Sequence, residues 1–280
     1  MFQRDILGKL SAWAQKSDRK PLVLRGARQV GKTTAVNLFS EKFDQYLYLN
    51  LEQKVERKIF EQDYPIAELI QALFFYKDQI KGNGKILIFI DEIQTCPSAV
   101  SYLRFFYESF PDLYIIAAGS LLETLIDTHI SFPVGRVEYL VLKPLNFKEF
   151  LNALDEKNSL DMIQNKIPAP NFVHDKLLKL FHTYSIIGGM PEIIQQYSDQ
   201  KDIISLNRVF DSLIVSYLDD VEKYARNNSM ATVIRHAVSH SFYEAGNRIK
   251  FQGFGNSHYK SREMGEALKV LEKAMLIYLL

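Results

Sequence analysis

The sequence predicts an α/β fold, in which a parallel sheet is sandwiched by helices and a helical region follows. Three observations indicate this class. Short apolar segments alternate with helical patterns through residues 20–142, which is typical of βαβ units with right-handed crossovers. The segment ILIFI at residues 86–90 is apolar throughout, as expected of a strand buried on both faces. From residue 172 onward almost every pattern has helical spacing.

The elements of the expected sheet are identified by apolar runs and turn residues. The strands are predicted at residues 21–24, 46–51, 85–90, 113–118 and 137–142. Helices are predicted at residues 5–14, 31–43, 65–80 and 98–110, with a short one after Ser120. The glycines of Gly82-Asn83-Gly84 end the helix before the third strand.

The texture of the chain changes after Pro144. Helices are expected at residues 146–154, 172–186, 191–199, 202–225 and 229–245. Residues 155–171 are polar and contain KIPAPN, so we expect a loop or boundary there and assign domains to residues 1–155 and 172–280. An amphipathic helix at 261–274 and an apolar strand, LIYLL, end the sequence. A final strand with no partner after it either pairs backward or ends a chain cut from a longer protein, and we favour the second.

Composition excludes several classes of protein. The 34 Lys and Arg residues balance 33 Asp and Glu residues, which excludes a generally basic nucleic-acid-binding coat. A single cysteine, Cys96, excludes a disulfide framework and a cysteine zinc cluster. Apolar runs of about five residues are far short of the ~20 of a membrane helix, and no secretory signal is present. We therefore expect a soluble, cytoplasmic protein without a membrane partner.

A phosphate-binding motif follows the first predicted strand. Residues 26–33, GARQVGKT, fit G-x-x-x-x-G-K-[ST] and open a predicted helix. The glycines let backbone N–H groups surround a phosphate, and the helix N-terminus adds partial positive charge. The nucleotide-binding residues are predicted to be Gly26, Ala27, Arg28, Gln29, Val30, Gly31, Lys32, Thr33 and Thr34. Lys32 is expected on the β- and γ-phosphates and the Thr33 hydroxyl on Mg²⁺; the alternative is a glycine-rich turn with an exposed lysine.

An acidic pair follows the apolar strand at 85–90. Asp91 is expected to hold Mg²⁺, and Glu92 to polarise the attacking water. The alternative is a pair of exposed carboxylates at a strand end. Because Lys32 precedes the pair with a strand and helices between them, the site interpretation is favoured. A glutamate points to hydrolysis by an activated water and not to a GTPase switch, which uses glutamine.

Two further polar residues are candidates for catalysis. Ser120 follows the strand at 113–118 and is predicted either to sense a γ-phosphate or to cap a helix. Arg136 lies in the loop just before the fifth strand, and we place it near the phosphate edge. It is predicted to supply positive charge to a γ-phosphate of its own or a neighbouring subunit, or to be a surface arginine. His236 and His240 share a helical face but lack the H-E-x-x-H order of a zinc site.

Five segments occur in a characteristic order: GARQVGKTT, ILIFIDEIQ, the strand end AAGS, VGRVEYLVLKPLNFKEFL and GGMPE. Together they resemble a bacterial and archaeal family of AAA-superfamily ATPases, over nearly the whole chain. Its members carry an ATPase domain, a helical and winged-helix region, and a C-terminal restriction-endonuclease-like domain. The resemblance implies the sheet order 5-1-4-3-2 and a Mg²⁺-dependent enzyme that hydrolyses ATP.

The resemblance also assigns roles to residues. The Walker A and Walker B motifs fall on residues 26–33 and 91–92. Ser120 takes the sensor position, where related families often have Asn or Thr, and Arg136 is an arginine-finger or sensor candidate. Residues 261–280 look like the recognition helix and first strand of a winged helix. The nuclease-like domain is absent from this sequence, which supports truncation and leaves no nuclease carboxylates to assign.

Two functions remain open at this stage. The first is an ATPase that couples its nucleotide state to a partner, possibly as a homo-oligomer. The alternative is a nucleotide-regulated DNA-binding module with little turnover, which binds DNA through the winged-helix region. The last helix carries basic residues, but Glu263, Glu266 and Glu272 offset them, so charge alone does not predict a DNA-binding face. A third function, a kinase that transfers phosphate to a small molecule, is disfavoured because the sequence shows no evident site for the acceptor molecule.

Overall fold

The computed structural model describes residues 2–119, 132–168 and 170–280. The chain forms two compact units, Met1–Ile194 and Gln195–Leu280. The boundary between them falls within one helix. The domain limits expected from the sequence, 1–155 and 172–280, stay a prediction.

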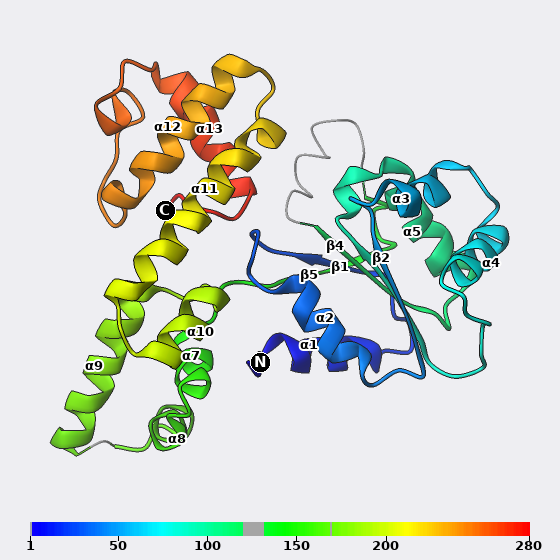
Figure 1. Cartoon of the computed structure of the whole chain (residues 1–280), viewed down its shortest axis with the longest axis horizontal. Helices are drawn as coiled ribbons and strands as arrows, with labels where there is room; N and C mark the ends of the chain where they lie inside the picture. The colour runs from blue at the N-terminus through cyan, green and yellow to red at the C-terminus, as the bar shows by residue number, and fades with distance from the viewer. Residues whose placement is uncertain (1, 120–131, 169) are drawn as a thin grey trace. The chain divides into compact units, whose positions relative to one another are not determined.

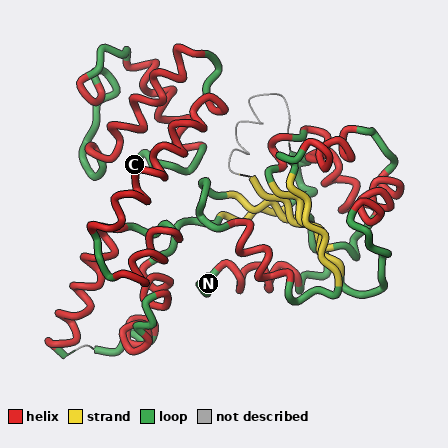
Figure 2. Tube along the Cα trace, in the orientation of Figure 1, coloured by secondary structure: helices red, strands yellow, loops and turns green. Residues whose placement is uncertain are grey.

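The first unit is built around a five-stranded parallel sheet (Figure 2). Its strands are β1 Leu22–Arg25, β2 Gln45–Asn50, β3 Ile86–Asp91, β4 Tyr114–Gly119 and β5 Glu138–Val141. They lie in the order β2-β3-β4-β1-β5, which confirms the predicted order read from the other edge. Every residue of β3 is buried, because this strand has neighbours on both sides and helices on both faces.

Helices cover both faces of the sheet (Figure 1). One face packs against α3 Lys54–Glu61, α4 Ile66–Tyr76 and α5 Pro97–Ser109, and Ile86, Ile88 and Ile90 of β3 belong to that core. The other face is covered by α1 Ile6–Ala14 and α2 Lys32–Ser40, where Trp13 packs edge-on against Tyr114 of β4. The sheet thus forms the middle layer of three, as the sequence predicts.

The chain continues from β5 into further helices. They are α7 Phe147–Ala153, α8 Lys157–Gln164, α9 Asn171–Ile187 and α10 Pro191–Gln200. Between α9 and α10, Gly189 lies so close to the segment before α7 that an added Cβ would be 2.2 Å from the Leu145 carbonyl oxygen. The Leu145 N–H donates to the Gly189 carbonyl at 2.7 Å, so the turn before α10 is fixed to the start of this helical segment.

The second unit is helical. Its main elements are α11 Asn207–Tyr224, α12 Asn228–Glu244 and α13 Ser261–Lys273, with short 3₁₀ turns at Ile204–Leu206 and Phe254–Asn256. Ile234 and Val238 of α12, and Met264 and Leu268 of α13, are buried. The helix predicted at 261–274 is therefore confirmed as an amphipathic element with an apolar buried face.

Three expectations about local structure need correction or comment. Residues 157–164 form α8, although a loop was predicted over 155–171. The apolar segment at 276–280 is not a strand, since the described part of the second unit offers no strand for it to pair with. Of the helix and strand predicted for a partial winged helix, the structure therefore contains only the helix. The short helix expected after Ser120 lies outside the described residues. No described helix has the length and apolar character needed to cross a bilayer.

Candidate functional site

Two of the predicted motifs meet at the carboxyl edge of the sheet. The loop at 26–31 follows β1. Asp91 is the last residue of β3, and Glu92 follows it. All five strands run parallel, so both segments emerge at the same edge, with β4 between their strands. Ligands of open parallel sheets bind at this edge.

The backbone of the loop explains its glycines. Gly26 has a φ of 155°, and a Cβ there would lie 2.3 Å from the carbonyl oxygen of Leu142. Gly31 has a φ of 93° and is the N-cap of α2, whose first hydrogen bond runs from the Ala35 N–H to the Gly31 carbonyl at 2.9 Å. A side chain at either position would strain the loop. The N-terminus of α2 is thus presented at the sheet edge.

Lys32 lies inside the curve of the loop. Its side chain is buried, with only 7% of the residue exposed. The Nζ atom donates hydrogen bonds of 2.9 Å to the carbonyl oxygens of both Gly26 and Ala27. Burial lowers the pKa of Lys32, whereas the nearby carboxylates of Glu92 and Asp91 raise it. The ammonium group therefore lies inside the loop, bonded to two of its carbonyl oxygens, and a negatively charged ligand there would stabilise its charged form.

Thr33 and Asp91 form a pair of oxygen donors. The Thr33 hydroxyl donates to Asp91 Oδ2 at 2.6 Å, and the Tyr48 hydroxyl approaches the same atom at 3.4 Å. Burial raises the pKa of Asp91, while its hydrogen bonds from Thr33 and from the Glu92 N–H act in the opposite direction. A hydroxyl beside a carboxylate is a suitable donor set for a hydrated Mg²⁺, which prefers hard oxygen ligands.

Glu92 is held in an unusual backbone conformation. Its φ of 54° lies in the left-handed region, which residues other than glycine seldom occupy. Its carboxylate accepts a short hydrogen bond from the Gln94 side-chain amide. Burial is the main cause that raises the pKa of Glu92, and the Asp91 carboxylate raises it further. Strained backbone of this kind is concentrated at functional sites.

The structure places Arg136 away from this edge. Arg136 precedes β5, whose first residue, Glu138, is in register with Leu22 at the start of β1. The Arg136 side chain donates to Glu108 at the end of α5 at 2.9 Å. It thus lies at the amino edge, so its expected position near the phosphate edge is wrong. Because the loop at 26–31 follows the opposite end of β1, this position does not fit action within one chain. Action on a neighbouring chain stays a prediction.

The other predicted nucleotide-binding residues lie in the same loop or on the first turn of α2: Ala27, Arg28, Gln29, Val30 and Thr34. Ser120 lies outside the described residues. Conversely, sequence reasoning missed Tyr48, Gln94 and Arg4, which contact the acidic pair or the loop. Nothing in the pattern around Arg4 indicates a role, because its partners are 26 to 145 positions away in sequence. Gln94 belongs to the segment that carries the resemblance but has no motif of its own.

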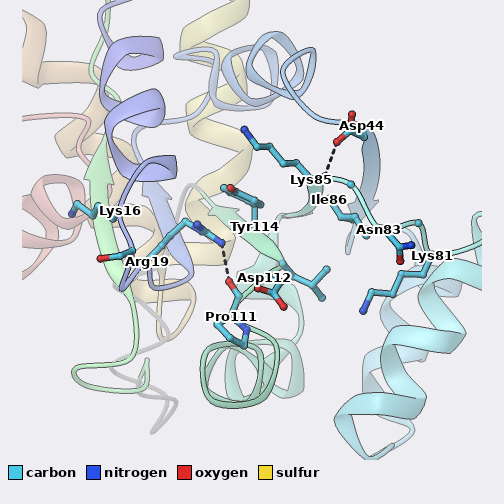
Figure 3. A pocket seen from close by; sticks show the side chains of 14 residues that line it. Lys16, Arg19, Asp44, Lys81, Asn83, Lys85, Ile86, Pro111, Asp112 and Tyr114 are labelled. Carbon is cyan, nitrogen blue, oxygen red and sulfur yellow. Dashed lines mark hydrogen bonds between the residues drawn. The ribbon is translucent and has the colours of Figure 1, made fainter.

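A separate hollow of about 920 Å³ lies at the amino edge of the sheet (Figure 3). Arg19 crosses it, with its guanidinium 3.6 Å from the ring centre of Tyr114 and a 2.8 Å hydrogen bond to the Pro111 carbonyl. Lys81 and Lys85 contribute further positive charge. The hollow is open and is formed by segments that enter the strands, so it is distinct from the edge where the loop and acidic pair meet.

Comparison with known proteins gives two family matches. Residues 18–151 match the model of an AAA domain, and residues 178–280 match a domain of unknown function, DUF8612. The second match covers the region that was expected to end in a partial winged helix, and it does not confirm that expectation. The loop and the acidic pair both fall within the first match. Residues 18–151 therefore match an AAA domain in sequence and have a P-loop ATPase-like fold.

One sequence relative and two solved structures are similar to this chain. An uncharacterized protein of Haemophilus influenzae is 25% identical over 201 residues, which is 69% of this chain and 45% of that protein. The chain thus spans less than half the length of this curated relative. The Walker-type ATPase PABY2304 of Pyrococcus abyssi is similar with a TM-score of 0.59 and 16% identity, over 98% of this chain and 90% of that one. Thermotoga maritima RuvB is similar more distantly, with a TM-score of 0.41 and 13% identity over 98% and 88%.

Proposed function

We propose that this chain binds ATP with Mg²⁺ at the carboxyl edge of its sheet, hydrolyses it to ADP and phosphate, and couples the nucleotide state to a partner. One observation supports this above all. Three groups converge there: the buried Lys32 inside a loop that begins and ends with glycine, the Thr33–Asp91 pair of hydroxyl and carboxylate, and the carboxylate of Glu92. Each has the chemistry that one part of a bound nucleotide and its metal would need.

Binding would use the loop amides and Lys32. The loop N–H groups and the N-terminus of α2 favour a phosphate at this position. Lys32 exchanges its bonds to the Gly26 and Ala27 carbonyls for bonds to phosphate oxygens. Thr33 and Asp91 are the residues that would hold Mg²⁺, which supplies charge neutralisation on the phosphates. The hydrogen bond between them already places both oxygens side by side.

Hydrolysis would depend on Glu92. A water oxygen forms a bond to the γ-phosphorus, the bond from that phosphorus to the β–γ bridging oxygen breaks, and ADP leaves with the electron pair. Glu92 accepts a proton from the water, and Gln94 holds the carboxylate in place through its amide. Lys32 stabilises negative charge that develops on the transferred phosphoryl group and the leaving oxygen.

The partner is proposed to act through the helical segments after β5. The DNA-binding alternative has less support, because residues 276–280, which completed the winged-helix interpretation, do not form a strand. DNA is therefore one outcome of the test and not part of the proposal.

The test compares ATP hydrolysis by the wild type and by Glu92→Gln, with and without double-stranded DNA. The amide keeps the size of the side chain but cannot accept the proton, so we expect ATP binding to persist and kcat to fall by about 10² or more. Glu41→Gln, at the exposed end of α2, is the matched control and should behave as the wild type. Full turnover by Glu92→Gln would contradict the proposed base, and binding without turnover in the wild type, together with DNA binding, would favour the alternative.

A further inference from the structure

Arg4 is a buried arginine that contacts the phosphate loop from outside the motif. Only 9% of the residue is exposed, although it precedes α1 near the start of the chain. One guanidinium nitrogen donates to the Val30 carbonyl at 3.1 Å, and the other donates to the Lys143 carbonyl at 2.7 Å. The Nε atom donates to Glu149 Oε1 at 3.0 Å. One side chain thus joins the loop to the segment after β5 and to α7.

The contact with Val30 fixes the direction of a peptide group. The Val30 carbonyl and the Gly31 N–H belong to one trans peptide, so the two bonds point in opposite directions. Arg4 holds the carbonyl on its own side, and the Gly31 N–H is therefore directed away from Arg4. Among the described residues, no acceptor is bonded to this N–H. It remains available for an anion at the N-terminus of α2.

The far end of the network is fully bonded, so Arg4 has a rigid anchor. Glu149 accepts from Arg4 and from the Asp5 N–H at 2.8 Å through one oxygen, and from the Asn146 N–H at 2.9 Å through the other. The Asn146 side chain accepts from the Glu149 N–H, which completes a capping box at the start of α7. The carboxylate is therefore locked by the helix that it caps.

We propose that Arg4 is a positioning residue that orients the Gly31 amide for phosphate binding and connects the phosphate loop to the first turn of α7. This inference rests on the proposed function. An arginine suits the role because its planar guanidinium donates in several fixed directions, toward Val30, Lys143 and Glu149 at once. A lysine has one compact ammonium group and cannot span all three acceptors.

The experiment uses two variants of the full chain. Arg4→Lys keeps the charge and loses the geometry. The double variant Arg4→Met with Glu149→Met removes both buried charges together, so neither charge is left uncompensated, although the Glu149 half of the α7 capping box is lost with it. Thermal unfolding of the unliganded chains is followed by circular dichroism, and the Kd for Mg²⁺–ATP is measured by calorimetry well below each Tm. The double variant Lys16→Met with Glu138→Met removes an ion pair at the opposite edge of the sheet and is the control.

We expect the Kd for ATP to rise about tenfold in the Arg4–Glu149 double variant and severalfold in Arg4→Lys, with kcat at saturating ATP nearly unchanged. This split arises because an amide contact to phosphate is made in both the ground state and the transition state. A general loosening of the fold would lower Tm without this selective effect on the Kd for ATP. The control should bind ATP as the wild type does.

Wild-type affinity in the double variant, whatever its Tm, would overturn the positioning role and leave Arg4 a purely structural residue. An equal loss of kcat and of affinity would overturn it as well, because the residue would then act on the chemical step. Failure of the wild type to bind ATP, or wild-type affinity in a Lys32→Met variant, would instead overturn the proposed function, and with it the role that rests on it.

Discussion

Replacement of Lys32 by methionine removes the ammonium group and keeps a side chain of similar length. An ammonium about 4 Å from a phosphate charge, at the effective dielectric of about 20 found in partly buried sites, is worth about 4 kcal/mol. To reach the phosphate, Nζ first leaves the Gly26 and Ala27 carbonyls, and each of these hydrogen bonds has a net worth of about 1 kcal/mol. The difference of about 2 kcal/mol corresponds to about thirtyfold weaker binding.

The assay is calorimetric titration of Lys32→Met with Mg²⁺–ATP, beside Lys42→Met. Lys42 follows α2, and its exposed Nζ donates to Ser11, so this control loses the same chemical group at a distance from the loop. In the absence of ATP, Lys32→Met should lower the free energy of unfolding only slightly, because burial already disfavours the charged lysine in the folded state. An affinity within twofold of the wild type in Lys32→Met would refute both the electrostatic reasoning and the phosphate-loop assignment.

Three further predictions concern the sheet and its edges. If Arg136 acts between chains, a mixture of Arg136→Ala and Lys32→Met should regain ATP hydrolysis that neither shows alone, measured by phosphate release; no regain on mixing would rule out a shared site. Gly26→Ala should lower both Tm and ATP affinity, since its Cβ would meet a backbone oxygen at 2.3 Å, whereas Gly8→Ala in α1, with nothing within 4 Å, should not. Cys96 is buried and burial raises its thiol pKa, so a thiol reagent at pH 8 should modify it about 100-fold more slowly in the native chain than in urea; comparable rates would show that the α5 N-terminus opens readily.

The sheet was predictable because its strands leave a strong local signal. Residues 86–90 are apolar without interruption, and residues 46–51 show the alternation of a half-buried strand. The order of the strands came from the resemblance to a family. Local sequence patterns predicted the wrong structure in two places: where the helical pattern is weak, and where a strand-like segment has no neighbouring strand to pair with. Helix α8 has few apolar residues and lies beside prolines, and 276–280 has the composition of a strand but no sheet to join.

The site residues were predictable only where a local backbone conformation demands particular residue types at fixed spacing. Gly26, Gly31 and Lys32 are recognisable because the loop needs glycines and a lysine at fixed spacing. Arg136 precedes β5, and a residue before a parallel strand lies at the amino edge of the sheet, so its predicted position near the phosphate edge is wrong. Arg4 could not be found at all, because its three acceptors come from distant segments that only folding brings together.

The left-handed backbone at Glu92 has a consequence for evolution and engineering. A residue with a Cβ in this region costs about 1 kcal/mol or more relative to glycine, so the folded chain stores strain at the proposed catalytic base. Glycine at this position would relieve that strain and remove the carboxylate at the same time. Selection for thermal stability alone would therefore favour loss of the glutamate here, and selection for the proposed hydrolysis would keep it.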